Sequence, residues 1–515
     1  MKFLPLLCVV ASLAWARPST RYWDYHVDHH SICLSTTRSA AALFSHLAAK
    51  LSPNATILLP SNPDMRTTHQ RWQAHAQPTY AAVVEVATED DVVTTVRFAN
   101  THSLPFLAVD GAHGATAALS KMHHGIAISF VRMKTVTLLP GGRLARLDPG
   151  LTNGDLVRAL WAQGKQTSTG RGMCPGVTGI ALGGGHGDLQ GLWGRPGDQM
   201  VEARVVLADG TRVTVSEREN EELWWAMRGA GHNFGIVTAM TWRVYERVER
   251  WSKVGLVFGG ERLEGVFAQA NGLLGRQPGG LTVYYIFLSG GVGEEAVVQI
   301  DFTFAGELSE LDGFAAPFRA LGPVSDQSWE GKTYMEINKL GGNDETSDLV
   351  CGKGYNRHMF GSYTKHHNIT ALRRVHYLFT NITNKYPGLG NLSVVFVEGY
   401  PQQGALKVPV DSTAVPYRAY PLLTAPLFTY TDPSWTDDIV ATTKEIKRVL
   451  TQAEGPNELP RGYVNYGIGD EESEELYGYD KWRLEKLRRL KRRYDPDGKF
   501  GFYAPIDASL GVWWC

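Results

Sequence analysis

RGMCPGVTGIALGGGHG, residues 171–187, joins a reactive side chain to a glycine-rich backbone. One thiol, Cys174, stands shortly before three consecutive glycines at 183–185. Upstream, the loop VDGAHG at 109–114 carries His113 between glycines. A glycine has no Cβ, so the backbone can approach a flat or phosphorylated ligand closely. A protein that holds a flavin by two covalent bonds needs two nucleophiles. An imidazole and a thiol, each in such a loop, are nucleophiles of this kind.

The overall composition is that of an ordinary globular protein. The chain has 515 residues, of which 43% are hydrophobic and 20% are charged. This length allows about two to three domains, and this composition excludes global disorder. Its 51 basic and 52 acidic residues give a net charge of -1, so nucleic acid is not an expected partner.

The N-terminus predicts a secretory signal at residues 1–16. Lys2 precedes a mostly apolar run at 3–13, and Ala14-Trp15-Ala16 is a cleavage site of the A-x-A type. The alternative is a buried first helix. The apolar run is too short to span a bilayer, and no later segment is long and apolar enough. Secretion agrees with four glycosylation sequons, at Asn54, Asn368, Asn381 and Asn391.

Cysteine usage leaves the pairing open. Cys8 would leave with the signal, and Cys33, Cys174, Cys351 and Cys515 would remain. An even number in a secreted protein permits two disulfides. If Cys174 instead holds a cofactor, one of the other three stays free or pairs between chains.

A strand–helix–strand unit precedes the His113 loop. Residues 80–86 and 104–109 have the pattern of strands, and a helix is expected from Glu89 to about Ala99. Thr88 is its expected cap, followed by acidic residues that the helix dipole favours. Further expected strands are 126–130, 135–139 and 200–207, and further expected helices are 154–163 and 221–228.

Composition changes after about Val244. Separate strand-like runs at 281–288, 296–304 and 392–398 interleave with helical stretches such as 371–380, which predicts a second α+β domain. Near the end, residues 481–493 are basic, but Leu484, Leu487 and Leu490 fall on one helical face. We interpret this segment as an amphipathic helix with a solvated basic face.

These motifs together resemble the berberine-bridge-enzyme-like branch of the vanillyl-alcohol-oxidase flavoproteins, of the fungal secondary-metabolite type. The resemblance covers roughly 75–245 and 390–506. It includes Cys174-Pro175, the glycines at 183–185, VVLADG at 205–210, LWWAMRGAGHNFGIVT at 223–238, STAVPYR at 412–418 and the closing pattern from Tyr463 to Phe500. It implies an α+β fold, with a two-lobed FAD-binding domain of the PCMH type at 60–245. A substrate domain at 246–456 would have a large antiparallel sheet covered by helices, and 457–515 would return to the FAD domain.

The resemblance implies a covalent flavin. His113 would bond to the 8α-methyl of the isoalloxazine and Cys174 to its C6 position. The remaining residues that would contact FAD are Gly111, Ala112, Gly114, Gly179, Gly183, Gly184, His186, Gly187, Gly231, Gly235, Ile236, Val237 and Asn465. Two departures stand out. The usual Gly-Gly-His-Ser loop is here Gly-Ala-His-Gly at 111–114, and the segment from Cys174 to Gly183 is shorter than in the common family version.

The expected reaction takes hydride from an alcohol or activated C–H of a small organic substrate to flavin N5 and passes electrons to O2. Such chemistry needs a base. We expect Tyr466 in this role, with Tyr463 or Glu398 as alternatives, although a tyrosine can equally serve only packing.

Other functions remain possible on the sequence alone. They are an oligosaccharide oxidase of the same family, and a flavin-holding protein that catalyses a redox-neutral cyclisation or only binds. A Rossmann dehydrogenase is disfavoured because a helix, not a strand, precedes the glycines at 229, 231 and 235. No metal site is expected, because the histidine pairs at 29–30, 123–124 and 366–367 lack zinc-site spacing. A monomer without membrane partners is expected.

Overall fold

The computed structural model describes residues 37–65 and 69–508. The predicted signal at 1–16, together with Cys33 and Cys515, lies outside these ranges. None of the helices within them is long and apolar enough to cross a membrane.

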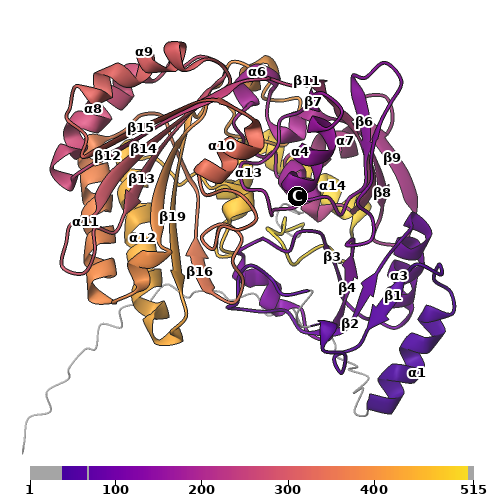
Figure 1. The fold of residues 1–515 in the computed structure, drawn as a ribbon. Helices are drawn as coiled ribbons and strands as arrows, with labels where there is room; N and C mark the ends of the chain where they lie inside the picture. The colour runs from indigo at the N-terminus through magenta and orange to yellow at the C-terminus, as the bar shows by residue number, and fades with distance from the viewer. Residues whose placement is uncertain (1–36, 66–68, 509–515) are drawn as a thin grey trace, which may run out of the picture.

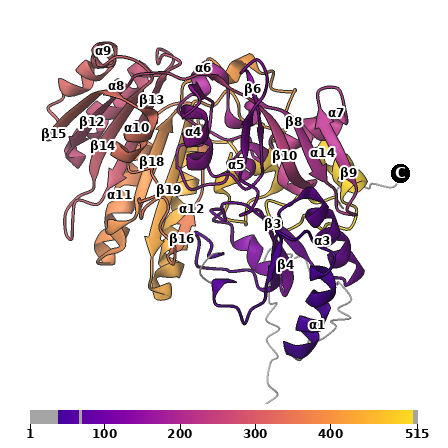
Figure 2. The ribbon, with the colours of Figure 1, turned by 45° about the vertical axis from the view of Figure 1, so that its right-hand side comes forward.

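A four-stranded sheet carries the His113 loop. Its order is β1-β2-β4-β3, with strands Thr56–Leu58, Tyr80–Glu85, Gly125–Ser129 and Phe106–Val109. Helix α3 (Glu89–Thr101) begins after Thr88, which forms the expected cap with Asp91. The strand–helix–strand unit is confirmed, but β4 lies between β2 and β3 and is parallel to both. Helices α1 (Thr37–Ala48) and α3 pack on this sheet (Figure 2).

A five-stranded antiparallel sheet lies beside it. Its order is β5-β6-β10-β8-β9, with strands Val136–Leu138, Leu144–Leu147, Ile236–Arg243, Met200–Val206 and Arg212–Ser216. Four helices accompany it: α4 (Asn153–Trp161), α5 (Val177–Leu182), α6 (Gln190–Trp193) and α7 (Glu221–Met227).

The end of the chain returns to this second sheet. Helices α13 (Ser473–Tyr477) and α14 (Lys481–Tyr494) are the last two, and Leu484, Leu487 and Leu490 share its core. The predicted apolar face of 481–493 is therefore confirmed. On this packing we propose that 60–245 and 457–515 form one domain and 246–456 the other.

The middle of the chain forms an eight-stranded sheet of order β15-β12-β14-β13-β18-β19-β16, with β17 on β19. Neighbouring strands of this sheet are paired antiparallel. The strands are Trp251–Phe258 (β12), Leu281–Leu288 (β13), Val297–Phe304 (β14), Ser325–Lys332 (β15), Asn356–Met359 (β16), Ser362–Thr364 (β17), Val394–Gly399 (β18) and Leu422–Tyr430 (β19). Four helices cover one face (Figure 1, left): α8 (Leu263–Leu273), α9 (Leu308–Arg319), α11 (Ile369–Lys385) and α12 (Thr436–Ala453).

Strand alternation assigns each side chain of this sheet to a face. In β18, Val395 and Val397 pack under the helices. Val394 and Phe396 belong to the cluster on the opposite face, which also contains Trp72 from outside the sheet. Glu398 follows Phe396 by two residues, so its side chain lies on the same face as those of Val394 and Phe396. The opposite face therefore meets the first part of the chain and carries a carboxylate at that contact.

Candidate active site

One cavity of about 370 Å³ opens between the two halves of the molecule. Its walls come from the His113 loop, residues 170–182, the 463–466 turn and the inner face of β13, β18 and β19. The structure brings most of the predicted site residues to this cavity. They are Gly111, Ala112, His113, Gly114, Gly179, His186, Gly235, Ile236, Val237, Glu398, Tyr463, Asn465 and Tyr466.

The cavity wall fits a flat cofactor because much of it is bare backbone. A Cβ added at Gly179 would meet nothing within 4 Å, so any side chain there would project into free space at the wall. A Cβ at Gly111 would lie 2.5 Å from the backbone nitrogen of Gly176, so the two glycine loops cross in close contact. Ala112 adopts φ 53°, in the left-handed region that favours glycine. The alanine at this position of the loop thus adopts a backbone conformation that a glycine takes more easily.

Four predicted cofactor glycines do not line the cavity. Their Cβ positions are filled by the protein itself: at Gly183 by Asn465, at Gly184 by Val415, at Gly187 by the Thr169 carbonyl and at Gly231 by Leu182. Gly184 also has φ 92°. These glycines allow segments to pack against one another, and the cofactor contacts at Gly183, Gly184, Gly187 and Gly231 stay predictions.

His113 is held on two sides. Its ring stacks on Trp72 with centroids 4.4 Å apart and an interplanar angle of 16°. Its Nε2 lies 2.7 Å from the Val350 carbonyl oxygen. Burial lowers the pKa of His113 to about 4, so the imidazole is neutral at physiological pH. A neutral imidazole keeps one nitrogen lone pair, which a nucleophile needs.

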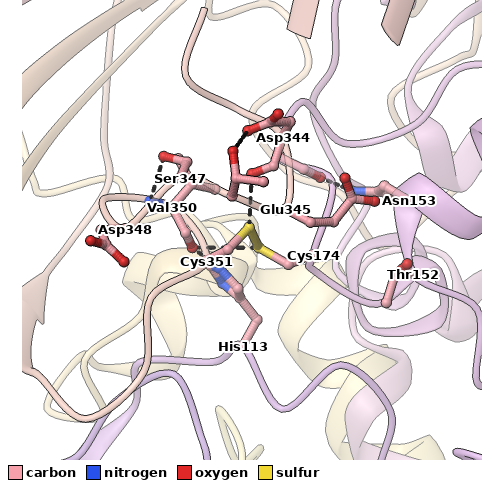
Figure 3. Close-up of a disulfide and its surroundings, with 12 residues drawn as sticks. His113, Thr152, Asn153, Cys174, Asp344, Glu345, Ser347, Asp348, Val350 and Cys351 are labelled. Carbon is pink, nitrogen blue, oxygen red and sulfur yellow. Dashed lines mark hydrogen bonds between the residues drawn. A yellow bond between two sulfur atoms is a disulfide. The ribbon is translucent and has the colours of Figure 1, made fainter. Parts of the chain in front are cut away.

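Cys174 forms a disulfide with Cys351, with Cα atoms 5.8 Å apart (Figure 3). A sulfur in a disulfide has no thiol, so Cys174 as seen here cannot bond to flavin C6. Cys174 also does not line the cavity, unlike its neighbours Gly172 and Pro175. The predicted second tether is therefore corrected to a disulfide. In the sequence, the shorter spacing from Cys174 to Gly183 was the signal against a bond between this cysteine and the flavin.

A carboxylate surrounded by phenols forms the polar part of the cavity. Tyr400 donates a hydrogen bond of 2.7 Å to Oε2 of Glu398, and Tyr466 donates one of 3.3 Å to Oε1. The Tyr284 and Tyr400 hydroxyls are also hydrogen-bonded to each other. Burial raises the pKa of Glu398 to about 7, against the opposing effects of Tyr400 and Arg171.

The tyrosines are poor candidates for the base. Burial raises the pKa of Tyr463 and of Tyr466 well above the usual range, and the nearby Glu398 carboxylate raises that of Tyr466 further. A group that accepts a proton near neutral pH needs a pKa near that pH. Glu398, named above as an alternative, meets this requirement, and Tyr466 is better suited to donate a hydrogen bond to it.

The other predicted residues have packing partners. His186 is hydrogen-bonded at both ring nitrogens, to Gln190 at 2.9 Å and Tyr363 at 2.7 Å. Asn465 donates to the Ile180 carbonyl at 3.1 Å and to the Tyr463 hydroxyl at 2.9 Å. These bonds fix the 463–466 turn over the cavity. Across the part of the chain that the structure describes, no three His, Cys, Asp or Glu side chains gather as a metal site would need.

Among the cavity residues that the sequence did not predict are Trp72, Arg171, Tyr284 and Tyr400. The Arg171 guanidinium lies 3.9 Å from the Tyr284 ring centroid. It is buried, 3.6 Å from Asp301. Tyr284 could have been found, because alternation along the predicted strand at 281–288 places it on the face opposite to Val283 and Tyr285. The other three lie outside the predicted elements and gave no periodic signal.

Comparison with known proteins identifies the family. Residues 80–216 match the family described as FAD binding domain, and residues 462–507 match the family described as berberine and berberine like. The chain is 35% identical over 509 residues to FAD-linked oxidoreductase anuG of Penicillium roqueforti, covering 97% of this chain and 98% of that one. It is 34% identical to FAD-linked oxidoreductase chyH of Penicillium rubens, with 96% and 97% covered.

Solved structures share the fold. Xylooligosaccharide oxidase of Myceliophthora thermophila superposes with a TM-score of 0.77 at 22% identity, covering 90% of this chain and 99% of that one. Glucooligosaccharide oxidase of Acremonium strictum gives 0.78 at 20% identity, with 90% and 99% covered. From the relatives, the fold and the backbone-lined cavity together, the chain belongs to the berberine-bridge-enzyme-like FAD-linked oxidoreductases and is an enzyme with FAD as its cofactor.

Proposed function

We propose that this enzyme is an oxidase of a small, largely apolar organic substrate that carries an alcohol or an activated C–H group. FAD would be attached to His113. FAD held there would supply the acceptor for the substrate hydride, with dioxygen as the final electron acceptor. The observation that carries the proposal is one cavity bordered both by His113 and by Glu398.

Glu398 would accept the substrate proton while Tyr466 and Tyr400 hold its two oxygens in place. Both hydroxyls donate to the carboxylate, so both stabilise its ionised form before substrate arrives. Their own pKa values stay high, which keeps them protonated in this role.

The apolar walls support the choice of substrate. Beside the carboxylate, the cavity is bordered by Trp72, Ile286, Met359, Phe396 and Leu427. A pocket for a sugar would need hydrogen-bond partners for many hydroxyl groups, since unpaired buried polar groups are costly. The wall around Glu398 instead offers surface for rings and alkyl groups.

An oligosaccharide oxidase is the second candidate, favoured by the names of the two solved structures described above. The glucooligosaccharide oxidase is also named as having a 6-S-cysteinyl, 8α-N1-histidyl FAD, which supports His113 as the tether here. A flavin-holding protein that only binds, or that catalyses a redox-neutral cyclisation, is the third.

Anaerobic mixing distinguishes these functions. The purified enzyme is mixed with apolar alcohols of aromatic and terpenoid type in one series and with xylobiose and cellobiose in another. We expect bleaching of the visible flavin band by members of the first series and hydrogen peroxide once air is admitted. Bleaching by the sugars alone would replace our proposal with the second candidate. An unbleached flavin in both series would favour the third.

Secretion also belongs to this proposal. Asn54, Asn381 and Asn391 are exposed, as glycosylation requires. Asn368 is exposed too, but its amide donates to the Ala453 carbonyl at 3.2 Å while its Oδ1 caps α11. We expect glycans at the first three sites and a lower occupancy at Asn368. Peptide mass spectrometry before and after enzymatic deglycosylation tests both expectations, and unglycosylated protein from the natural host would contradict the secretory route.

A further inference from the structure

We propose that the Cys174–Cys351 disulfide is a positioning device for covalent attachment of FAD. It holds the Val350 carbonyl that selects the tautomer of His113, so that Nδ1 is the nitrogen that bonds to the cofactor. The inference rests on the proposed attachment of FAD to His113.

The hydrogen bond at Nε2 fixes the tautomer. A carbonyl oxygen only accepts, so the Nε2 of His113 must carry the proton that it shares with Val350. In a neutral imidazole the lone pair then lies on Nδ1. That nitrogen has no hydrogen-bond partner within the described residues, and the His113 ring borders the cavity. The nucleophilic nitrogen is thus the one left free.

The ring is also fixed in its plane. Trp72 stacks on one face of His113, and the Arg357 guanidinium lies 4.1 Å from the Trp72 ring centroid. Arg357 donates in turn to the Trp72 carbonyl. Stacking sets the plane of the imidazole, while the Val350 carbonyl sets its rotation within that plane. Both are needed to aim one nitrogen at one carbon atom.

The Val350 carbonyl belongs to a segment of turns, in which the Cys351 amide donates to the Ser347 carbonyl at 2.7 Å. Residues 341–355 connect α10 (Tyr334–Leu340) to β16 and contain no helix or strand. Cys351 follows Val350 directly, so the disulfide ties the carbonyl to the loop that contains Cys174 (Figure 3). The Cys174 sulfur lies 3.5 Å from that carbonyl oxygen. Other attachments of the same segment are the Met173 amide, which donates to the Asn343 carbonyl at 2.9 Å, and an exposed ion pair between Arg158 and Glu345.

The bond formation itself balances with dioxygen as the oxidant. One methyl C–H bond at the 8α position breaks and its proton is released. The Nδ1 lone pair forms the new N–C bond, and two electrons remain on the flavin ring. Dioxygen takes these two electrons with two protons and becomes hydrogen peroxide. The imidazole keeps its Nε2 proton throughout, so the bond to Val350 stabilises the positive charge that the ring gains.

The test compares the wild type with the Cys174→Ser/Cys351→Ser double variant and, as a second chemical replacement, the Cys174→Ala/Cys351→Ala double variant. Each holoprotein is precipitated with acid, and flavin is measured in the pellet and in the supernatant. Total flavin per protein and the melting temperature report folding and binding. Glu345→Gln is the matched control, because it removes the ion pair of the same segment but leaves the disulfide.

We expect wild type and Glu345→Gln to keep their flavin in the pellet on His113-containing peptides. The double variants should bind FAD but release it to acid, with covalent incorporation in air slowed by on the order of 100-fold, as loss of an aligned geometry implies. Full covalent incorporation in either folded double variant would overturn the proposal, and so would flavin on a Cys174 peptide of the wild type. A wild type that releases all its flavin would also overturn it, while substrate bleaching would still decide the proposed function separately.

Discussion

Replacing Glu398 by glutamine separates proton acceptance from every other role of this side chain. The glutamine keeps the shape. Its one amide oxygen can accept a hydrogen bond from one of the two hydroxyls of Tyr400 and Tyr466, and its NH2 group can donate to the other, but it cannot take a proton at neutral pH. Removal of a positioned general base lowers rates by about 10²- to 10⁴-fold. We expect this loss in the rate constant of flavin reduction, with little change in flavin content.

Glu398→Gln should also raise the free energy of unfolding above neutral pH, although it lowers the rate of flavin reduction. Burial raises the pKa of Glu398 from 4.5 to about 7, so between these values the folded state binds more protons than the unfolded state. The free energy of unfolding therefore falls as pH rises through this window. The full loss above pH 7 is about 3 kcal/mol by the usual conversion of a pKa shift to free energy. Glu398→Gln lacks this loss and should be the more stable protein at pH 8.

Two measurements test the reasoning. Anaerobic stopped-flow experiments between pH 5 and 9 should show a wild-type reduction rate that rises through about pH 7, and a slow, flat profile for Glu398→Gln. Chemical unfolding at pH 5 and pH 8 should show the gain in stability only at pH 8. Glu310→Gln, an exposed position on α9, is the control and should leave both unchanged. A variant that reduces its flavin within about tenfold of the wild type at pH 8 would refute Glu398 as the base.

Three further substitutions test the surroundings of the site. Tyr400→Phe removes a hydrogen bond to the ionised form of Glu398, so the rise in the pH profile should move up by about one pH unit, and an unchanged profile would contradict that contact. Ala112→Gly removes the strain of a left-handed alanine at φ 53° and should raise the free energy of unfolding by about 1 kcal/mol, measured by denaturant titration. A loss of stability would show that the alanine methyl is needed there. Asp198→Asn breaks the buried pair in which Arg418 donates to both carboxylate oxygens, and should cost about 3–5 kcal/mol of stability, whereas a cost near that of an exposed pair would contradict its burial.

The local sequence was sufficient for the elements and for half of the site. Strand-like runs at 281–288, 296–304 and 392–398 predicted β13, β14 and β18, and the cap at Thr88 predicted the start of α3. These signals depend on neighbours along the chain. The His113 loop was predicted to hold the cofactor from its resemblance to the family, because its glycines alone fit an ordinary turn equally well. The closing pattern from Tyr463 to Phe500 predicted a contact with the flavin because this pattern resembles that of the family.

Only the tertiary structure decided which chemical state each site residue adopts. Cys174 is a disulfide partner because folding brings Cys351, 177 positions away, within bonding distance. Glu398 rather than Tyr466 is suited to accept a proton because burial shifts both pKa values upward, the carboxyl toward neutrality and the phenol away from it. Reactivity depends on desolvation and on partners distant in sequence, and neither is encoded in a short motif.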